Sequence, residues 1–252
     1  MLFNIEGKRI LVTGSTSGLG LVLAEGLAKA GASVVLNGRT QEKVDIAVHS
    51  LITRGFKASG FAFDITHSSE VERQITEIEK CQGPIDVLVN NAGIQHRAPL
   101  EEFKLEDWNK VINTNLTGAF IVSKAVAQGM IHRTNGKIIN ICSLQSELAR
   151  PSIAPYATAK GGLKMLTRGM ATEWAKYNIQ VNAIGPGYFK TDMTRPLYEN
   201  QEFDSWLRKR TPANRWGNPE ELIGTLIYLA SQASSFLNGQ IIYVDGGITA
   251  CI

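Results

Sequence analysis

The sequence predicts an α/β fold in which a doubly wound, seven-stranded parallel sheet carries helices on both faces. Short apolar runs rich in β-branched residues alternate with longer helical stretches along the whole 252-residue chain. This alternation is typical of parallel strands joined by right-handed crossovers. The first apolar run also leads directly into a glycine-rich turn and then into a helical stretch, which is a common arrangement at phosphate-binding sites.

The elements follow one another in strict alternation. The predicted strands are residues 9–13, 33–37, 58–63, 85–90, 137–142, 179–184 and 241–244. The predicted helices are residues 18–30, 41–53, 69–81, 107–133, 155–177 and 219–231. No repeat, low-complexity linker or break in composition divides the chain, so residues 1–252 are expected to form a single dinucleotide-binding catalytic domain.

Composition excludes several classes of protein. A net charge of +3 without any block of Lys or Arg gives no reason to expect nucleic acid or a membrane surface as a partner. The opening residues lack the features of a signal peptide, and no apolar stretch is long enough to span a bilayer. Three cysteines without C-x-x-C spacing favour reduced thiols in a cytoplasmic protein. The four histidines show no metal-ligand spacing, so no metal is expected.

One segment interrupts the alternation. Residues 195–217 carry charges and aromatic side chains but no strand pattern. Because ligands bind beside the carboxyl ends of strands in open α/β sheets, we predict a substrate lid around residues 192–217. An ordinary surface excursion is the alternative.

The glycine-rich turn predicts a nucleotide site. Gly14, Gly18 and Gly20 lie between the first strand and the first helix, where they allow a tight turn and let backbone N–H groups approach a pyrophosphate. The spacing is G-x-x-x-G-x-G rather than the commoner G-x-G-x-x-G. The strand–turn–helix context nevertheless favours a Rossmann-like dinucleotide site over a plain loop.

The end of the second strand predicts the cofactor. Folds that bind NAD usually place an acidic side chain there, on the ribose 2′-hydroxyl. Here Gly38 occupies that place and Arg39 follows it. A guanidinium group pairs well with a 2′-phosphate, so we predict NADP, with NAD accepted less well. The alternative is that Arg39 is a solvated loop residue.

Three further residues predict acid–base chemistry. Tyr156 and Lys160 are four residues apart in a predicted helix and therefore share a face, and Ser143 ends an apolar run just before it. A phenol titrates near ~10, so action at neutral pH requires a stabilisation of ~4 kcal/mol. A cation at ~4 Å supplies ~1 kcal/mol in water but ~4 kcal/mol at an effective dielectric constant of ~20. Lys160 therefore suffices only in a semi-enclosed cleft, and a second positive charge there would help.

These motifs, taken in order, resemble the short-chain dehydrogenase/reductase family along nearly the whole chain. The matching stretches are T-G-S-T-S-G-L-G, N-N-A-G, N-T-N-L-T, Ser143, Tyr156, Lys160 and P-G-Y-F-K-T. The resemblance implies that Ser143 holds the substrate oxygen, Tyr156 transfers the proton and Lys160 lowers the pKa of Tyr156. It also implies that Asn115 breaks its helix and anchors a water in the proton relay.

The same resemblance implies a set of cofactor contacts: Gly14, Ser17, Gly18, Leu19, Gly20, Arg39, Asp64, Ile65, Asn91, Ala92, Gly93, Tyr156, Lys160, Pro186, Gly187 and Thr191. Ser17 departs from one NADP pattern of the family, which has a basic residue there. Arg39 is therefore expected to be the main phosphate contact. Family members are usually homotetramers, and the apolar residues on several faces of the helix at 107–133 suit such an assembly. A deeply buried helix of a monomer is the alternative.

Four stretches, including N-A-G-I-Q-H-R and I-C-S-L-Q-S-E-L, are similar to a subgroup that interconverts gluconate and 5-ketogluconate with NADP(H). A sugar acid needs a cation for its carboxylate and polar groups for its hydroxyls, and such residues follow two of the strands. The predicted substrate contacts are Arg97, Ser143, Gln145, Glu147, Arg150 and Tyr156, with His96 close by. Arg97 is the first choice for the carboxylate, because a guanidinium group binds a carboxylate in bidentate fashion.

Several alternatives stay open. Glu147 and Arg150 could pair with each other instead of binding a ligand. The same chemistry could act on another polyol, another sugar acid or a 3-oxoacyl thioester. A protein that binds NADP without turnover is a further alternative, but it would have no chemical need for Ser143, Tyr156 and Lys160 together.

Overall fold

The computed structural model describes residues 2–251 and contains the predicted sheet. Seven parallel strands lie in the order β3-β2-β1-β4-β5-β6-β7. They are β1 (Arg9–Val12), β2 (Ser33–Gly38), β3 (Ala58–Ala62), β4 (Val87–Asn90), β5 (Gly136–Ile141), β6 (Ile179–Pro186) and β7 (Ile241–Val244). The predicted fold class is confirmed, and strand boundaries differ from the prediction by two residues at most.

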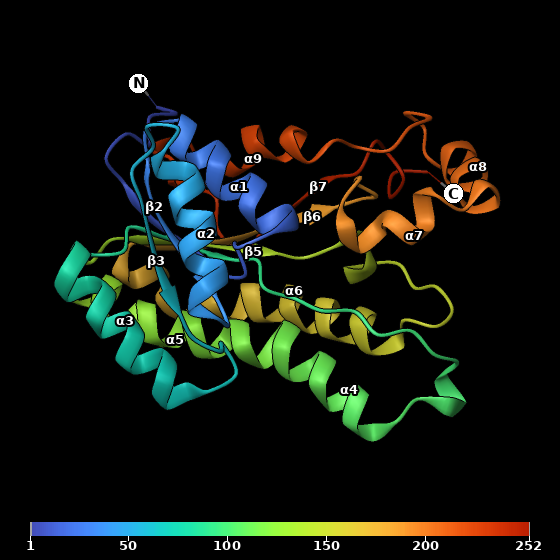
Figure 1. Ribbon diagram of the computed structural model, residues 1–252, viewed down its shortest axis with the longest axis horizontal. Helices are drawn as coiled ribbons and strands as arrows, with labels where there is room; N and C mark the ends of the chain where they lie inside the picture. The colour runs from blue at the N-terminus through green and yellow to red at the C-terminus, as the bar shows by residue number, and fades with distance from the viewer. Residues whose placement is uncertain (1, 252) are drawn as a thin grey trace.

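Helices cover both faces of the sheet (Figure 1). Helices α1 (Gly18–Lys29), α2 (Gln41–Ile52) and α9 (Ile223–Ala230) pack on one face. Helices α3 (Ser68–Gln82), α5 (Gly118–His132) and α6 (Ala154–Trp174) pack on the other. The sheet has one hydrophobic core on each face. Successive side chains of β1 point to opposite faces, so Ile10 and Val12 belong to the core under α1, α2 and α9, and Leu11 belongs to the core under α3, α5 and α6. None of the helices within residues 2–251 is long and apolar enough to cross a membrane.

The helix predicted at residues 107–133 is interrupted. It consists of α4 (Leu105–Ile112), a π-helical turn (Asn113–Thr117) and α5. The prediction of one regular helix is therefore wrong, while the implied break at Asn115 is present. At the break the Asn115 side chain pairs with the backbone of Ile94, outside the helix, accepting from its N–H at 2.7 Å and donating to its carbonyl at 2.8 Å.

The strand order reverses between β1 and β4, because the chain leaves β1 for β2 on one side and later returns to β4 on the other. Crossovers that diverge in this way leave a crevice at the carboxyl ends of the strands. Helices α7 (Arg195–Tyr198) and α8 (Gln201–Arg210), drawn in orange, lie beyond the same ends of the sheet (Figure 1). The segment predicted as a lid is thus placed at the edge where ligands bind in such sheets.

Candidate active site

A cleft of about 720 Å³ opens at the reversal of strand order. Every residue predicted to contact the cofactor lines it, together with Ser143. These residues are Gly14, Ser17, Gly18, Leu19, Gly20, Arg39, Asp64, Ile65, Asn91, Ala92, Gly93, Ser143, Tyr156, Lys160, Pro186, Gly187 and Thr191. The structure therefore brings segments from all parts of the sheet into one site.

The glycine turn is held close to the loop after β4. A side chain at Gly20 would place its Cβ 2.3 Å from the Gly14 carbonyl oxygen and 2.4 Å from the Asn91 amide nitrogen. The same Asn91 amide donates to the Gly14 carbonyl at 3.1 Å. Gly18 has a φ of +53° and no atom within 4 Å of the position that a Cβ would take, so it faces open space. This open, glycine-lined start of α1 fits a pyrophosphate.

The end of β2 forms the second half of the nucleotide site. A Cβ at Gly38 would approach the Thr16 side chain to 2.5 Å, so a larger residue is disfavoured at the position where an acid binds a ribose hydroxyl. Arg39, Thr40 and Lys43 line the cleft from here, and Thr40 occupies the N-cap position of α2 without a side-chain hydrogen bond to the helix. The positive charges of Arg39 and Lys43 and the hydroxyl of Thr40 suit the 2′-phosphate of NADP as a ligand.

Sequence reasoning missed several residues of this lining, among them Thr16, Thr40, Lys43, Ile94, Thr114, Phe189 and Met193. Lys43 could have been predicted from its position in the sequence. It follows Arg39 by four residues across the start of a predicted helix, close enough in sequence for both side chains to reach one phosphate. The other residues carry no distinctive chemistry in the sequence.

Asp64 lies at the far side of the nucleotide site, after β3. Partial burial opposes its ionisation, but hydrogen bonds from the Thr66 backbone and hydroxyl hold the pKa of Asp64 below its usual range. His67 and Arg39 act in the same direction. Asp64 is therefore a fixed hydrogen-bond acceptor at the rim of the cleft.

Ser143, Tyr156 and Lys160 meet inside the cleft. Ser143 follows β5 and its hydroxyl faces the phenol of Tyr156 in the first turns of α6. One turn further along, Lys160 is 4% exposed and its Nζ donates to the Ile141 carbonyl at 2.7 Å. The Lys160 Nζ lies 5.7 Å from the centre of the Tyr156 ring. A cation, a phenol and a hydroxyl thus share one partly enclosed space.

Taken together, the protein's own groups raise the pKa of Tyr156, whereas the sequence led us to expect a lowered value. Burial raises it to about 12, and the hydrogen bond with Ser143 offsets only part of that effect. Burial also lowers the pKa of Lys160, whose ammonium group is directed at a carbonyl. The physical reason is that removing a phenolate from water costs more here than the hydrogen bond with Ser143 returns.

Asn115 is 1% exposed, so its side chain is buried and does not face solvent. Its side chain holds Ile94 through the pair of hydrogen bonds described above. A Cβ at Gly93 would lie 3.1 Å from the Asn115 Oδ1. Asn115 therefore fixes the loop after β4, of which Asn91, Ala92, Gly93 and Ile94 line the cleft.

The loops that carry Arg97 and Arg150 are joined beyond the cleft lining, where the Ala98 N–H donates to the Ser152 carbonyl at 3.2 Å. Arg97 donates to the Gln95 side chain at 3.0 Å, and Arg150 donates to the Tyr188 hydroxyl at 3.1 Å. Burial and then the nearby Arg150 lower the pKa of Arg97, while Tyr188 opposes this. Within residues 2–251 neither arginine forms an ion pair with a carboxylate. Two neighbouring cations without an anion fit an anionic ligand.

Glu147 is placed elsewhere. It pairs with Lys164 and accepts a hydrogen bond from the Tyr243 hydroxyl at 2.8 Å. The alternative of a Glu147–Arg150 pair is therefore wrong, and Glu147 has less capacity for a ligand than expected. His96 turns towards α4, where its Nε2 lies 3.6 Å from the Asp107 carboxylate.

Gln145 is buried, and its backbone N–H donates to the Ser143 hydroxyl at 3.1 Å. The Gln145 Oε1 is buried without a hydrogen-bond partner among residues 2–251. Gln145, Glu147, Arg97 and Arg150 do not line the cleft itself. Among the predicted substrate contacts, only Ser143 and Tyr156 do so.

A doubly wound sheet with a dinucleotide-type cleft and an adjacent serine, tyrosine and lysine defines a class of nucleotide-dependent oxidoreductase. Residues 8–202 match the family model of the short chain dehydrogenases. The chain belongs to this family.

The chain is also similar to individual members of this family. The chain is 54% identical to the gluconate 5-dehydrogenase of Gluconobacter oxydans, over 100% of this chain and 98% of the relative. It is 52% identical to the 2-dehydro-3-deoxy-D-gluconate 5-dehydrogenase of Formosa agariphila, over 100% of this chain and 96% of that protein. A solved structure of the gluconate 5-dehydrogenase from Burkholderia cenocepacia, in complex with NADP and tartrate, superimposes with a TM-score of 0.98. That protein is 52% identical, with 100% of this chain and 98% of the other covered.

Proposed function

We propose that this protein is an NADP-dependent oxidoreductase that reversibly interconverts gluconate and 5-ketogluconate by hydride transfer. The observation that carries the proposal is the meeting of Ser143, Tyr156 and Lys160 in a nucleotide-shaped cleft. Arg97 and Arg150, two neighbouring cations without an anionic partner, support an anionic substrate. The relatives named for gluconate chemistry over the full chain length support the same substrate.

The protein's residues divide the chemistry as follows. NADP, when bound, supplies the hydride acceptor for oxidation and, in its oxidised form, a positive charge. The Ser143 hydroxyl holds the oxygen at the reacting carbon, and Tyr156 removes the proton of that hydroxyl during oxidation and returns it during reduction. Lys160 adds a positive charge beside the phenol. Because burial raises the pKa of Tyr156 to about 12, we infer that the charge of the oxidised cofactor is needed as well.

The direct test is an absorbance assay of the reduced cofactor with a panel of substrates. We expect NADP and gluconate to give turnover at a higher kcat/KM than neutral polyols of the same length. A 3-deoxy-2-keto sugar acid belongs in the panel, because the Formosa agariphila relative is named for such a substrate. If a 3-oxoacyl thioester is the best substrate instead, the sugar-acid proposal is wrong.

Arg39→Ala is expected to lower the preference for NADP over NAD by about 10–100-fold, because a charge-assisted hydrogen bond contributes about 1.5–3 kcal/mol. Lys43 would retain part of the preference. Steady-state kinetics with both cofactors measure the effect. Arg73→Ala, at an exposed position on α3 outside the cleft, serves as the matched control. An unchanged ratio of kcat/KM values in Arg39→Ala would overturn the assignment.

Arg97→Ala is expected to raise KM for gluconate by about 10–100-fold, with a smaller change in KM for NADP, because the lost contact is to the substrate carboxylate. Steady-state kinetics with each substrate varied in turn measure both constants. Arg168→Ala, on an exposed part of α6, is the control. The carboxylate assignment is wrong if Arg97→Ala and Arg150→Ala both leave KM for gluconate unaltered.

A further inference from the structure

Arg150 is held by two aromatic side chains rather than by a carboxylate. Its guanidinium group donates to the Tyr188 hydroxyl at 3.1 Å and lies 4.9 Å from the centre of the Phe203 ring. Phe203 belongs to α8, in the segment predicted as a lid. These contacts orient the cation while leaving its charge without a counter-ion, so the charge remains available to a ligand.

Tyr188 itself has little freedom to move. It follows Gly187, where a Cβ would lie 2.7 Å from the Asp245 backbone, and its carbonyl accepts from the Gly217 N–H at 2.9 Å. Its ring meets Phe203 edge-on at 5.7 Å and Trp216 edge-on at 5.6 Å between ring centres. The backbone and the ring are thus fixed independently, which places the hydroxyl at a defined point.

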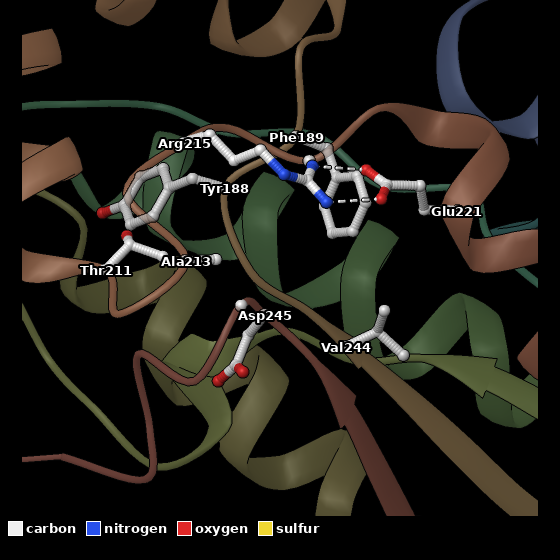
Figure 2. Close-up of a pocket in the computed structure, with 10 residues that line it drawn as sticks. Tyr188, Phe189, Thr211, Ala213, Arg215, Glu221, Val244 and Asp245 are labelled. Carbon is white, nitrogen blue, oxygen red and sulfur yellow. Dashed lines mark hydrogen bonds and ion pairs between the residues drawn. The ribbon is translucent and has the colours of Figure 1, made fainter.

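Figure 2 shows a cavity to whose wall Tyr188 contributes. Tyr188 lies beside Thr211 on the wall of a cavity of about 70 Å³, across from the ion pair of Arg215 with Glu221. The Arg215–Glu221 pair is closed on itself at 2.7 Å for both contacts. The Asp245 carboxylate on the same cavity accepts from the Gly247 N–H at 2.8 Å and from the Thr249 N–H at 2.9 Å. Both carboxylates of this cavity thus already have partners.

The two arginines would separate without such support, because like charges repel. The loops that carry them are joined by the Ala98 N–H, which donates to the Ser152 carbonyl at 3.2 Å. Arg150 is close enough to Arg97 to lower the pKa of Arg97. The Tyr188 hydroxyl accepts directly from Arg150 at 3.1 Å.

We propose that Tyr188 is a positioning residue for the substrate carboxylate: its hydroxyl holds Arg150 towards Arg97, and the two guanidinium groups together bind the carboxylate of the sugar acid. The inference rests on the proposed function and assigns a role to a residue that the catalytic chemistry does not use. It predicts that Tyr188 determines acceptance of anionic over neutral substrates.

Tyr188→Phe removes one hydroxyl oxygen and keeps the ring contacts with Phe203 and Trp216. We expect KM for gluconate and the inhibition constant of tartrate each to rise about tenfold, since one hydrogen bond to a charged group is lost. We expect kcat to change less than about twofold and KM for NADP to stay unchanged. A merely structural role would move all of these constants together.

Tyr198→Phe is the matched control, because Tyr198 belongs to the same aromatic cluster and meets Trp216 edge-on at 5.9 Å. It should leave KM for gluconate unchanged. The double variant Tyr188→Phe, Arg150→Ala should bind gluconate no more weakly than Arg150→Ala alone, because the hydroxyl acts through Arg150.

Different results would refute the proposed function and the role of Tyr188. If the wild-type enzyme does not oxidise gluconate, the proposed function fails. If it does, and Arg97→Ala raises KM while Tyr188→Phe leaves KM and tartrate inhibition unchanged, the role of Tyr188 alone is wrong. Additive effects of Tyr188→Phe and Arg150→Ala would also overturn it.

Discussion

Tyr156→Phe is expected to reduce kcat by about 10³-fold or more while leaving the affinity for NADP nearly unchanged. The variant keeps the ring in the first turns of α6 and removes only the hydroxyl that faces Ser143. Without that hydroxyl, no group in the described cleft stands between Ser143 and Lys160 to take the proton. Turnover is measured by absorbance of the reduced cofactor, and NADP binding by calorimetry.

Tyr177→Phe provides the control for this substitution. Tyr177 lies just beyond the other end of α6, in the short helical turn Ala175–Tyr177, and does not line the cleft. It should retain wild-type kcat. If Tyr156→Phe retains wild-type turnover, the assignment of Tyr156 as the acid–base residue is wrong. If the variant binds NADP weakly, Tyr156 acts in cofactor binding in place of proton transfer.

Lys160→Met has the second largest expected effect, a fall in kcat/KM of about 10²-fold with a shift of the pH profile. Oxidation needs the phenolate form of Tyr156, whose pKa burial already raises to about 12. Removing the nearby positive charge raises that pKa further, so the fraction of phenolate at any given pH falls. The rate of oxidation should therefore still be rising with pH where the wild-type rate has levelled off.

Lys160→Met also leaves the buried Ile141 carbonyl without its hydrogen-bond donor. We expect a loss of about 1–3 kcal/mol in the free energy of unfolding, measured by denaturant titration. Lys176→Met, at an exposed position after α6, should change neither the pH profile nor stability beyond about 0.5 kcal/mol. A pH profile of Lys160→Met that overlays the wild type would mean that Lys160 does not act on the phenol.

The fold was predictable because its signals are local and repeated. Each buried strand is a short run of apolar residues. It can therefore be recognised from its own sequence, without knowledge of the strands beside it. The glycine turn is recognisable from its own sequence, because Gly14, Gly18 and Gly20 directly follow the first strand, although the close approaches at Gly14 and Gly20 also involve Ala92 and Asn91 of the loop after β4. The helix at residues 107–133 was the exception. Its π-helical turn depends on Ile94, which lies outside the helix.

The candidate site was predictable in its cofactor half and only partly in its substrate half. Tyr156 and Lys160 meet because helical periodicity alone puts them on one face. Glu147 was misplaced, because its partners Lys164 and Tyr243 come from α6 and β7 and no local pattern links them to it. Tyr188 carried no sequence signal beyond its position after Pro186 and Gly187. The expected assembly and the lid movement stay predictions.

The sequence by itself determined the parallel sheet, the phosphate-binding turn and the spacing of the phenol and the ammonium, since each depends on backbone geometry over a few residues. Only the tertiary structure decided the environment of those groups. Burial sets the pKa of Tyr156 at about 12, and packing of the β5–α6 loop against Tyr188 and Phe203 brings Arg150 to Arg97. Desolvation and charge proximity depend on residues distant in the chain, so no local pattern specifies them.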